Sequence, residues 1–166
     1  MAKITFKGNP IETVGSLPSV GTQAPEFTLV RKDLSDATLD SFEGKAKVLN
    51  VFISLDTGTC AASVKEFNHR AAQLKDVVVL HISIDLPFAQ SRFCKAETIN
   101  NSEALSAFRS DFPIDYGLEI TSGPLAGLCS RAVIVLDKEN RVIYAEQVPE
   151  ITEEPNYSKV LKVLGA

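Results

Sequence analysis

Two apolar runs on either side of one helical segment constrain the fold of this chain more than any other feature. KVLNVFIS (residues 47–54) and DVVVLHISID (residues 76–85) are nearly continuous and rich in β-branched residues, as strands buried on both faces are. Between them, apolar residues recur at helical spacing, at Ala61, Val64, Phe67, Ala71 and Leu74. The pattern predicts a βαβ unit with a right-handed crossover.

Polar residues on the predicted helix complete its amphipathic pattern. The residues expected to face away from the sheet are Lys65, Glu66, Asn68 and Arg70. The helix would therefore cover the sheet with one apolar face.

The N-terminal part of the chain predicts short strands. KITFKG and IETVG flank Asn9-Pro10, a turn signal that predicts a hairpin at a sheet edge. Weak alternation within residues 26–42 predicts two further short strands.

The C-terminal half predicts a second hairpin and a last helix. RAVIVLD and RVIYAEQV form the hairpin, with its turn at Glu139-Asn140. TEEPNYSKVLKVLG predicts a helix with Pro155 near its start and Gly165 at its end. SEALSAF (residues 102–108) fits either a helix or a short strand. The whole pattern predicts an α/β domain with a mixed sheet and helices on its faces.

Length and charge narrow the possible functions. The 166 residues suit one domain, residues 1–166, and 45% of them are hydrophobic. The net charge of −4, with acids and bases interspersed, gives no basic footprint for nucleic acid and no polybasic patch for lipid. No apolar run approaches the roughly 18 residues of a membrane span. MAKITFKGNP does not read as a signal peptide, so we expect a cytoplasmic protein.

The three cysteines are Cys60, Cys94 and Cys129. In a reducing compartment a permanent disulfide framework is not expected, so any disulfide among them would be transient and redox-active or catalytic. Their spacings of 34 and 35 residues fit no compact metal motif, and neither histidine is paired with them. No metal site is expected.

Cys60, in DTGTC, follows the first predicted strand and falls in the first turn of the predicted helix. Ligands of α/β sheets bind beyond the carboxyl ends of the strands. Free N–H groups and the positive end of the helix dipole favour an anion there, and a thiolate is such an anion. Thr57 either points its hydroxyl at the sulfur or caps the helix, and Gly58 would allow close backbone approach. Cys60 is thus either a small core residue or a nucleophile.

Cys94 and Arg131 are the other candidates. Cys94 ends a helix-like segment, DLPFAQSRFCKAE (residues 85–97), after the second predicted strand. It is either structural or a partner for Cys60, after local unwinding if the two are far apart at rest. Arg131 opens a buried strand, where a charge needs an anionic partner; a guanidinium facing Cys60 would stabilise its thiolate. Cys129 is read as non-catalytic.

Several motifs together resemble a known family. They are FKGNPI, KDLSD, KVLNVF, DTGTCAASV, DLPFAQSRFC, GPLAGL, SRAVIVLD and EEPNY. In this order they resemble the thiol peroxidase family of peroxiredoxins, the atypical two-cysteine kind found in bacteria, over essentially the whole chain.

The resemblance implies a thioredoxin-like (peroxiredoxin) fold with an N-terminal β-hairpin, and a homodimer. It implies that Cys60 is the peroxidatic cysteine and Cys94 the resolving cysteine of the same chain. Thr57 would hydrogen-bond the sulfur and the peroxide, and Arg131 would hold both. Hydrogen peroxide and alkyl hydroperoxides would be reduced through a Cys60 sulfenic acid and a Cys60–Cys94 disulfide. Thioredoxin would supply the reducing equivalents, without a cofactor.

Two positions depart from the family pattern. Ile53 stands where the motif P-x-x-x-T-x-x-C has proline, so it either continues the strand or reshapes the pocket. Lys95 stands where glycine usually follows the resolving cysteine, and either lowers the pKa of Cys94 or stiffens a segment that must unwind. The alternative function is a redox sensor or binding module that uses the Cys60–Cys94 couple with little turnover.

Overall fold

The computed structural model describes residues 2–165. These residues form two sheets. The strands are β1 (Lys3–Phe6), β2 (Asn9–Glu12), β3 (Thr28–Val30), β4 (Asp36–Thr38), β5 (Ala46–Val51), β6 (Val77–Ser83), β7 (Glu103–Ser106), β8 (Ala132–Leu136) and β9 (Val142–Gln147). The helices are α1 (Gly58–Ala71), α2 (Pro87–Ala96), α3 (Phe112–Asp115), α4 (Tyr157–Val163) and a 3₁₀ turn, η1 (Leu39–Phe42).

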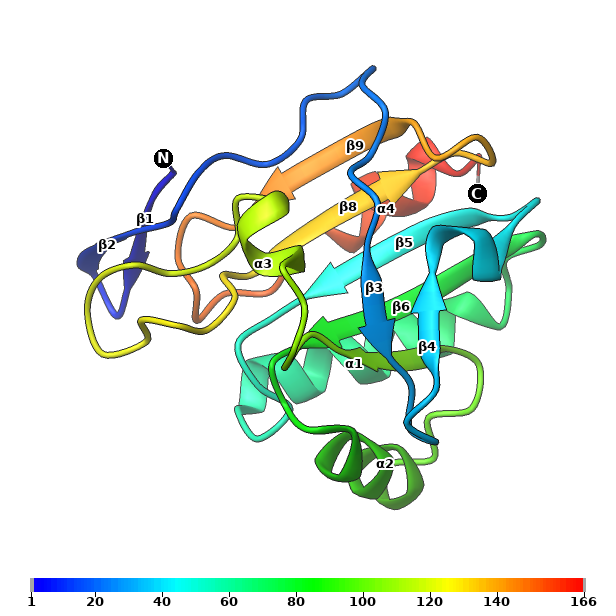
Figure 1. The fold of residues 1–166 in the computed structure, drawn as a ribbon, viewed down its shortest axis with the longest axis horizontal. Helices are drawn as coiled ribbons and strands as arrows, with labels where there is room; N and C mark the ends of the chain where they lie inside the picture. The colour runs from blue at the N-terminus through cyan, green and yellow to red at the C-terminus, as the bar shows by residue number, and fades with distance from the viewer. Residues whose placement is uncertain (1, 166) are drawn as a thin grey trace.

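A seven-stranded mixed sheet organises the fold, in the order β4-β3-β7-β6-β5-β8-β9. The central strands β5, β6 and β7 are parallel, and the strands outside them pair antiparallel. Strand β5 connects through α1 to the parallel neighbour β6, which confirms the predicted βαβ unit. In Figure 1, β3 and β4 cross β5 and β6 steeply, so the sheet is strongly twisted.

Alternation along the strands divides the core between the two faces of the sheet. Val48 and Val79 point to the face covered by α1 and α4, where they pack with Phe67 and Val160. The other face carries a larger cluster that is closed by η1 and α3; its members from the central strands are Leu49, Val51, Leu80, Ile82, Ile134 and Leu136. Figure 1 shows α1 behind the sheet and α3 in front of it. Successive side chains of a strand point to opposite faces, which is why fully apolar runs form these central strands.

The N-terminal hairpin is confirmed, but its predicted turn is wrong. The two turn residues are Lys7 and Gly8, with φ of 50° and 80°, and Asn9 and Pro10 lie in strand β2. A two-residue hairpin turn of this kind needs positive φ at both positions, which proline cannot adopt. The hairpin also forms its own sheet, joined to the rest by a bridge between Thr5 and Glu150.

Three further expectations are settled by the structure. Strand β5 ends at Val51 rather than at residue 54, so Ile53 does not continue the strand. The segment that fitted either element is strand β7. Asn68, expected to face away from the sheet, is only 8% exposed, because its side-chain oxygen accepts hydrogen bonds from the Asn101 N–H and the Ser102 hydroxyl.

The C-terminal elements agree with the sequence pattern. The β8–β9 hairpin turns through Asn140, whose φ is 64°. Helix α4 starts after Asn156, whose side chain accepts from the Lys159 N–H, and Gly165 follows its end with φ of 81°. None of the helices in residues 2–165 is long and apolar enough to cross a membrane.

Candidate active site

Cys60 lies in the first turn of α1, three residues after Thr57, the residue that precedes the helix. The thiol is fully buried. The short loop from β5 brings it to the carboxyl end of the parallel strands, where the sequence predicted a reactive group. Gly58 is not required for close approach, since a Cβ there would meet nothing within 4 Å.

The Arg131 guanidinium contacts the Cys60 sulfur directly. Its Nη2 donates to Cys60 Sγ at 3.0 Å, and its Nε donates to the Ile151 carbonyl at 2.8 Å. The side chain is 1% exposed, and its Nη1 is buried without a partner among the described residues. The residue precedes β8 directly, and β8 pairs with β5, which leads to Cys60. A buried, partly unsatisfied guanidinium is costly unless it has an anion to bind.

The Thr57 hydroxyl does not cap α1. It donates to the Ser54 carbonyl at 3.0 Å, and it makes no capping bond to the helix. Thr57 nevertheless lines the same small cavity as Arg131. It is therefore at the site, with its hydroxyl held by the loop before the helix.

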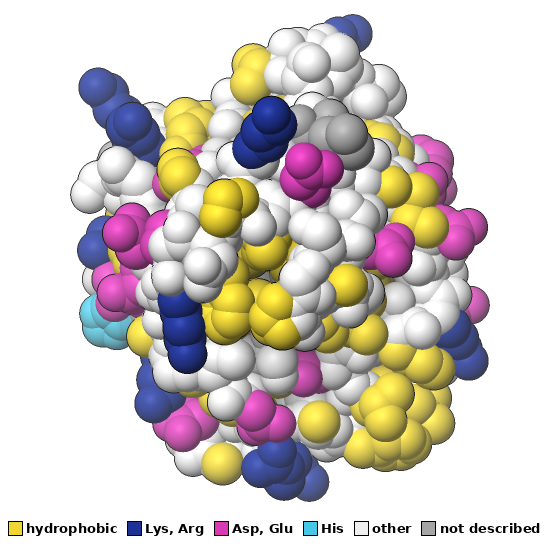
Figure 2. Space-filling model, turned by 90° about the vertical axis from the view of Figure 1, so that its left-hand side faces the viewer, with side chains coloured by type: hydrophobic (Ala, Val, Ile, Leu, Met, Phe, Trp, Pro, Cys, Tyr) yellow, Lys and Arg dark blue, Asp and Glu magenta, His cyan; other side chains and the backbone are white. Residues whose placement is uncertain are grey.

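A cavity of about 300 Å³ opens beside Arg131. Its lining residues are Phe6, Lys7, Ile53, Thr57, Gly58, Thr59, Arg131, Ile151 and Thr152. They come from the N-terminal hairpin, the β5–α1 loop, the start of α1 and the segment after β9. Figure 2 views this end of the molecule and shows hydrophobic side chains gathered around a hollow near the middle of the face. A partly apolar pocket with one cation suits a small polar group on an organic molecule.

Cys94 lies near the end of α2 and is 5% exposed. It belongs to the same apolar cluster as Cys60, together with Phe52, Leu55 and Phe93. Both thiols are free. Burial raises the pKa of Cys94, and the charge of Lys32 opposes that shift. The two cysteine-bearing segments thus share one core region without being bonded.

Cys129 is separated from this chemistry. It is fully buried in the other large cluster, with Tyr116 and Leu118. Burial, with the charges of Glu119 and Asp85 behind it, raises its pKa to about 12. A thiol in that state is a poor nucleophile, which agrees with the non-catalytic reading.

Sequence reasoning missed Asp85, which organises the loop before Cys60. Its carboxylate accepts from the Ser54 hydroxyl at 2.7 Å, the Leu55 N–H at 2.8 Å and the Ser83 hydroxyl at 2.6 Å. Asp85 ends the second apolar run and begins the segment that carries Cys94, so a polar residue at a strand end was the available signal. It ties the loop of one cysteine to the segment of the other.

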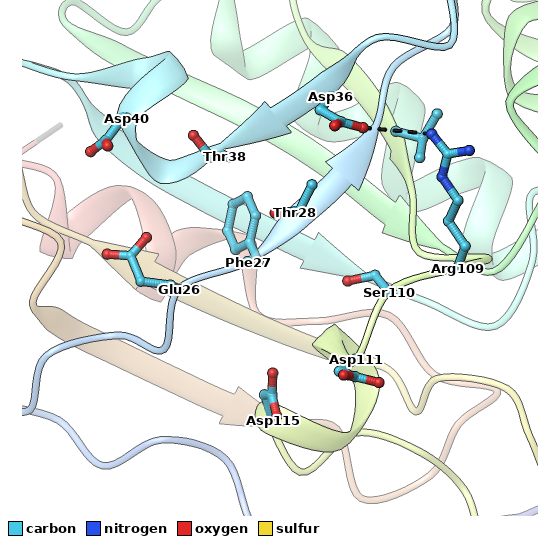
Figure 3. Close-up of a pocket in the computed structure, with 11 residues that line it drawn as sticks. Glu26, Phe27, Thr28, Asp36, Thr38, Asp40, Arg109, Ser110, Asp111 and Asp115 are labelled. Carbon is cyan, nitrogen blue, oxygen red and sulfur yellow. Dashed lines mark ion pairs between the residues drawn. The ribbon is translucent and has the colours of Figure 1, made fainter.

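The largest hollow in the described residues is elsewhere. It has a volume of about 600 Å³ and is lined mainly by polar side chains, among them Glu26, Asp40, Asp111 and Asp115. Figure 3 shows these carboxylates around Phe27, with Arg109 paired to Asp36 at 3.6 Å. It contains no cysteine. Within residues 2–165, no group of three His, Cys, Asp or Glu side chains is placed to hold a metal ion.

A twisted mixed sheet, a cysteine at a helix N-terminus and an arginine on its sulfur define a class of thiol-based redox proteins. The Redoxin family matches residues 19–161, and the chain belongs to this family.

Within the family, the relatives are more specific. A thiol peroxidase of Mycobacterium bovis is 52% identical over 166 residues, which is 100% of both chains. The crystal structure of a peroxiredoxin-like protein from Aquifex aeolicus has a TM-score of 0.94 and 41% identity, covering 99% of this chain and 96% of that one. A thiol peroxidase from Chromobacterium violaceum has a TM-score of 0.91 and 26% identity, covering 98% and 95%. The chain is a member of the thiol peroxidase group, with a thioredoxin-like peroxiredoxin fold.

Proposed function

We propose that this chain is a thiol-dependent peroxidase that reduces hydrogen peroxide and alkyl hydroperoxides at Cys60. One observation carries the assignment of the site: Arg131 Nη2 lies 3.0 Å from Cys60 Sγ while Nη1 is buried and unpaired. The guanidinium bonds the sulfur with one nitrogen and has another left for a peroxide oxygen. The N-terminus of α1 adds its dipole on the same side of the sulfur.

The first step is a nucleophilic displacement at oxygen. The Cys60 thiolate attacks the terminal oxygen of ROOH, the S–O bond forms and the O–O bond breaks. The leaving RO⁻ takes a proton and departs as ROH, or as water when the substrate is hydrogen peroxide. Cys60 becomes a sulfenic acid. Arg131 stabilises negative charge on the sulfur before attack and on the leaving oxygen during it.

Cys94 completes the oxidative half-reaction. Its sulfur attacks the sulfur of the Cys60 sulfenic acid, a disulfide forms and water leaves. Both thiols are buried and free in the same cluster, so α2 opens locally before they bond. The burial that raises the pKa of Cys94 keeps its proton in place while α2 is folded, and opening to water relieves this.

A dithiol protein of the thioredoxin type then returns the disulfide to two thiols and is itself oxidised. Thiol peroxidases work through cysteines alone, so no cofactor is involved. We also infer one domain over residues 1–166, a homodimer and a cytoplasmic location. The three free cysteines support a reducing compartment, and the resemblance to atypical two-cysteine peroxiredoxins supports the dimer and the reductant.

The test is steady-state NADPH oxidation, coupled through thioredoxin reductase and thioredoxin, with hydrogen peroxide or cumene hydroperoxide. Wild type should turn over, Cys60→Ser should not, and Cys129→Ser should match wild type. Unchanged turnover in Cys60→Ser would sink the assignment. A redox sensor, the competing function, would form its disulfide with one equivalent of peroxide but show negligible NADPH oxidation.

A further inference from the structure

Residues 149–152 join three parts of the site. Ile151 N donates to the Thr5 carbonyl at 2.9 Å, and Thr5 N donates to the Pro149 carbonyl at 2.8 Å, so the segment runs beside the N-terminal hairpin. The Thr59 hydroxyl, at the start of α1, donates to the Thr152 carbonyl at 3.0 Å. The Ile151 carbonyl lies between these attachments, and it accepts the Nε of Arg131.

Arg131 depends on that carbonyl for its orientation. Of its three guanidinium nitrogens, Nη2 meets the reacting sulfur and Nη1 has no partner among the described residues. The 2.8 Å bond from Nε to Ile151 is therefore its one anchor to a protein oxygen within residues 2–165. A guanidinium is a planar fork, so fixing Nε fixes where the other two nitrogens point.

Glu150 holds this segment against the hairpin. Its Oε1 accepts from the Gly8 N–H at 2.8 Å and the Thr5 hydroxyl at 3.1 Å. Its Oε2 accepts from the Thr152 N–H at 2.9 Å and the Thr152 hydroxyl at 2.8 Å. The backbone bonds from Thr152 and Gly8 lower the pKa of Glu150 to about 2. The carboxylate is thus ionised at any working pH, and its four charge-assisted bonds persist.

We propose that Glu150 is a positioning residue for peroxide reduction, which fixes the Ile151 carbonyl and through it the Arg131 guanidinium on the Cys60 sulfur. The inference rests on the proposed function and extends it. The N-terminal hairpin, which lies outside the main sheet, becomes a structural part of the active site. The hairpin residues Phe6 and Lys7, which line the cavity, are held in place by the same carboxylate.

The test compares Glu150→Gln with Glu153→Gln, an exposed glutamate of the same segment whose side chain makes no hydrogen bond within residues 2–165. Reduced protein is mixed with hydrogen peroxide, quenched with a maleimide, and Cys60 oxidation is followed by mass spectrometry. Glu150→Gln should lower the second-order rate about tenfold, because small misplacements of a reacting group are costly. Glu153→Gln should match wild type, and reduction of the oxidised protein by thioredoxin should be equally fast in all three.

A double-mutant cycle separates positioning from a general loss of stability. In an Arg131→Lys background, Glu150→Gln should have little further effect, because the group that it positions is gone. Equal additional losses in both backgrounds would overturn the inference. Thr152→Val removes one of the four donors, should give a smaller fall, and serves if Glu150→Gln does not fold. A reactive wild type with an equally reactive Glu150→Gln overturns this inference alone, whereas an unreactive wild type overturns the proposed function with it.

Discussion

At the scale of single residues, the pair of Cys60 and Arg131 carries the chemistry. A buried guanidinium needs a compensating anion, and none of the ion pairs among residues 2–165 involves Arg131. Its contact with Cys60 Sγ supplies that anion when the cysteine is a thiolate. The arrangement therefore stabilises the reactive form of the sulfur and the position of the arginine together.

Replacing Arg131 with lysine should slow Cys60 oxidation by about 100-fold, the cost of losing one well-placed charge-stabilising donor. An ammonium keeps the charge but cannot bond the sulfur and the Ile151 carbonyl in the same fork geometry. The measurement is the rate of Cys60 oxidation in rapid-quench experiments. Arg70→Lys, at the far end of the same helix and paired to Glu66, is the matched control and should react like wild type.

Ile53 tests how the pocket departs from the family motif. It is 6% exposed, lies beyond the end of β5, and lines the cavity beside Arg131 and Thr57. Ile53→Pro would restore the motif proline and remove a β-branched side chain from the pocket wall. Because the position is outside the sheet ladder, we expect the variant to fold and to turn over peroxide faster in the coupled assay. Slower turnover would show that the natural pocket is adapted to Ile53.

At the scale of secondary-structure elements, Asp85 joins the loop before α1 to the segment that begins α2. Asp85→Asn keeps one acceptor but turns a donor toward groups that also donate, and the Leu55 N–H cannot rotate away. We expect a loss of about 1–3 kcal/mol in the free energy of unfolding, measured by urea denaturation. Asp40→Asn, an exposed aspartate without a side-chain hydrogen bond in the described residues, should change it by less than about 0.5 kcal/mol. Equal stability of the two variants would contradict this role of Asp85.

Elements with a strong repeating pattern were predictable from the sequence. The period of two in the strands and of about 3.6 in α1 identified the βαβ unit, and turn residues identified both hairpins. The misplaced turn at Asn9-Pro10 and the buried Asn68 have a different origin. Backbone dihedral angles chose Lys7 and Gly8 for the turn, and the partners of Asn68 lie more than thirty residues away. Local pattern carries no information about such contacts.

The same limit applies to the candidate site. Cys60 and Arg131 were found because a cysteine at a helix start and a charge at the start of a buried strand are unusual. The Ile151 carbonyl was not, because any residue supplies a carbonyl and only the fold decides where it points. Glu150 was missed for a related reason, since its donors are mostly backbone groups of a distant hairpin and loop.

At the scale of the whole molecule, a buried polar network crosses the sheet layer between the two cysteine-bearing segments. Asn50 Nδ2 lies 3.1 Å from His81 Nδ1, and His81 Nε2 lies 2.7 Å from the Ser102 hydroxyl. Since the amide nitrogen only donates, Nδ1 is the acceptor and Nε2 carries the proton. Burial lowers the pKa of His81 to about 3, so the folded protein keeps this ring neutral.

That histidine makes stability depend on pH. Unfolded, His81 takes up a proton near pH 6.5, but folded it does so only near pH 3, so the unfolded state binds more protons between these values. Stability should therefore fall as the pH falls through this window, by roughly 2 kcal/mol between pH 6.5 and 5 from this group alone. Urea denaturation of wild type and His81→Gln checks it. The variant should lose less stability over that range, and identical pH profiles would contradict a neutral buried His81.

The central claim is that Cys60 is the peroxidatic cysteine and that Cys94 resolves it within one chain. The most direct measurement is intact-mass and peptide-mapping mass spectrometry of the reduced protein after one equivalent of hydrogen peroxide. The account predicts a loss of two hydrogens per chain, with Cys60 linked to Cys94 and Cys129 still free. Oxidation that leaves Cys60 as a thiol, or that links it to Cys129, would contradict the account.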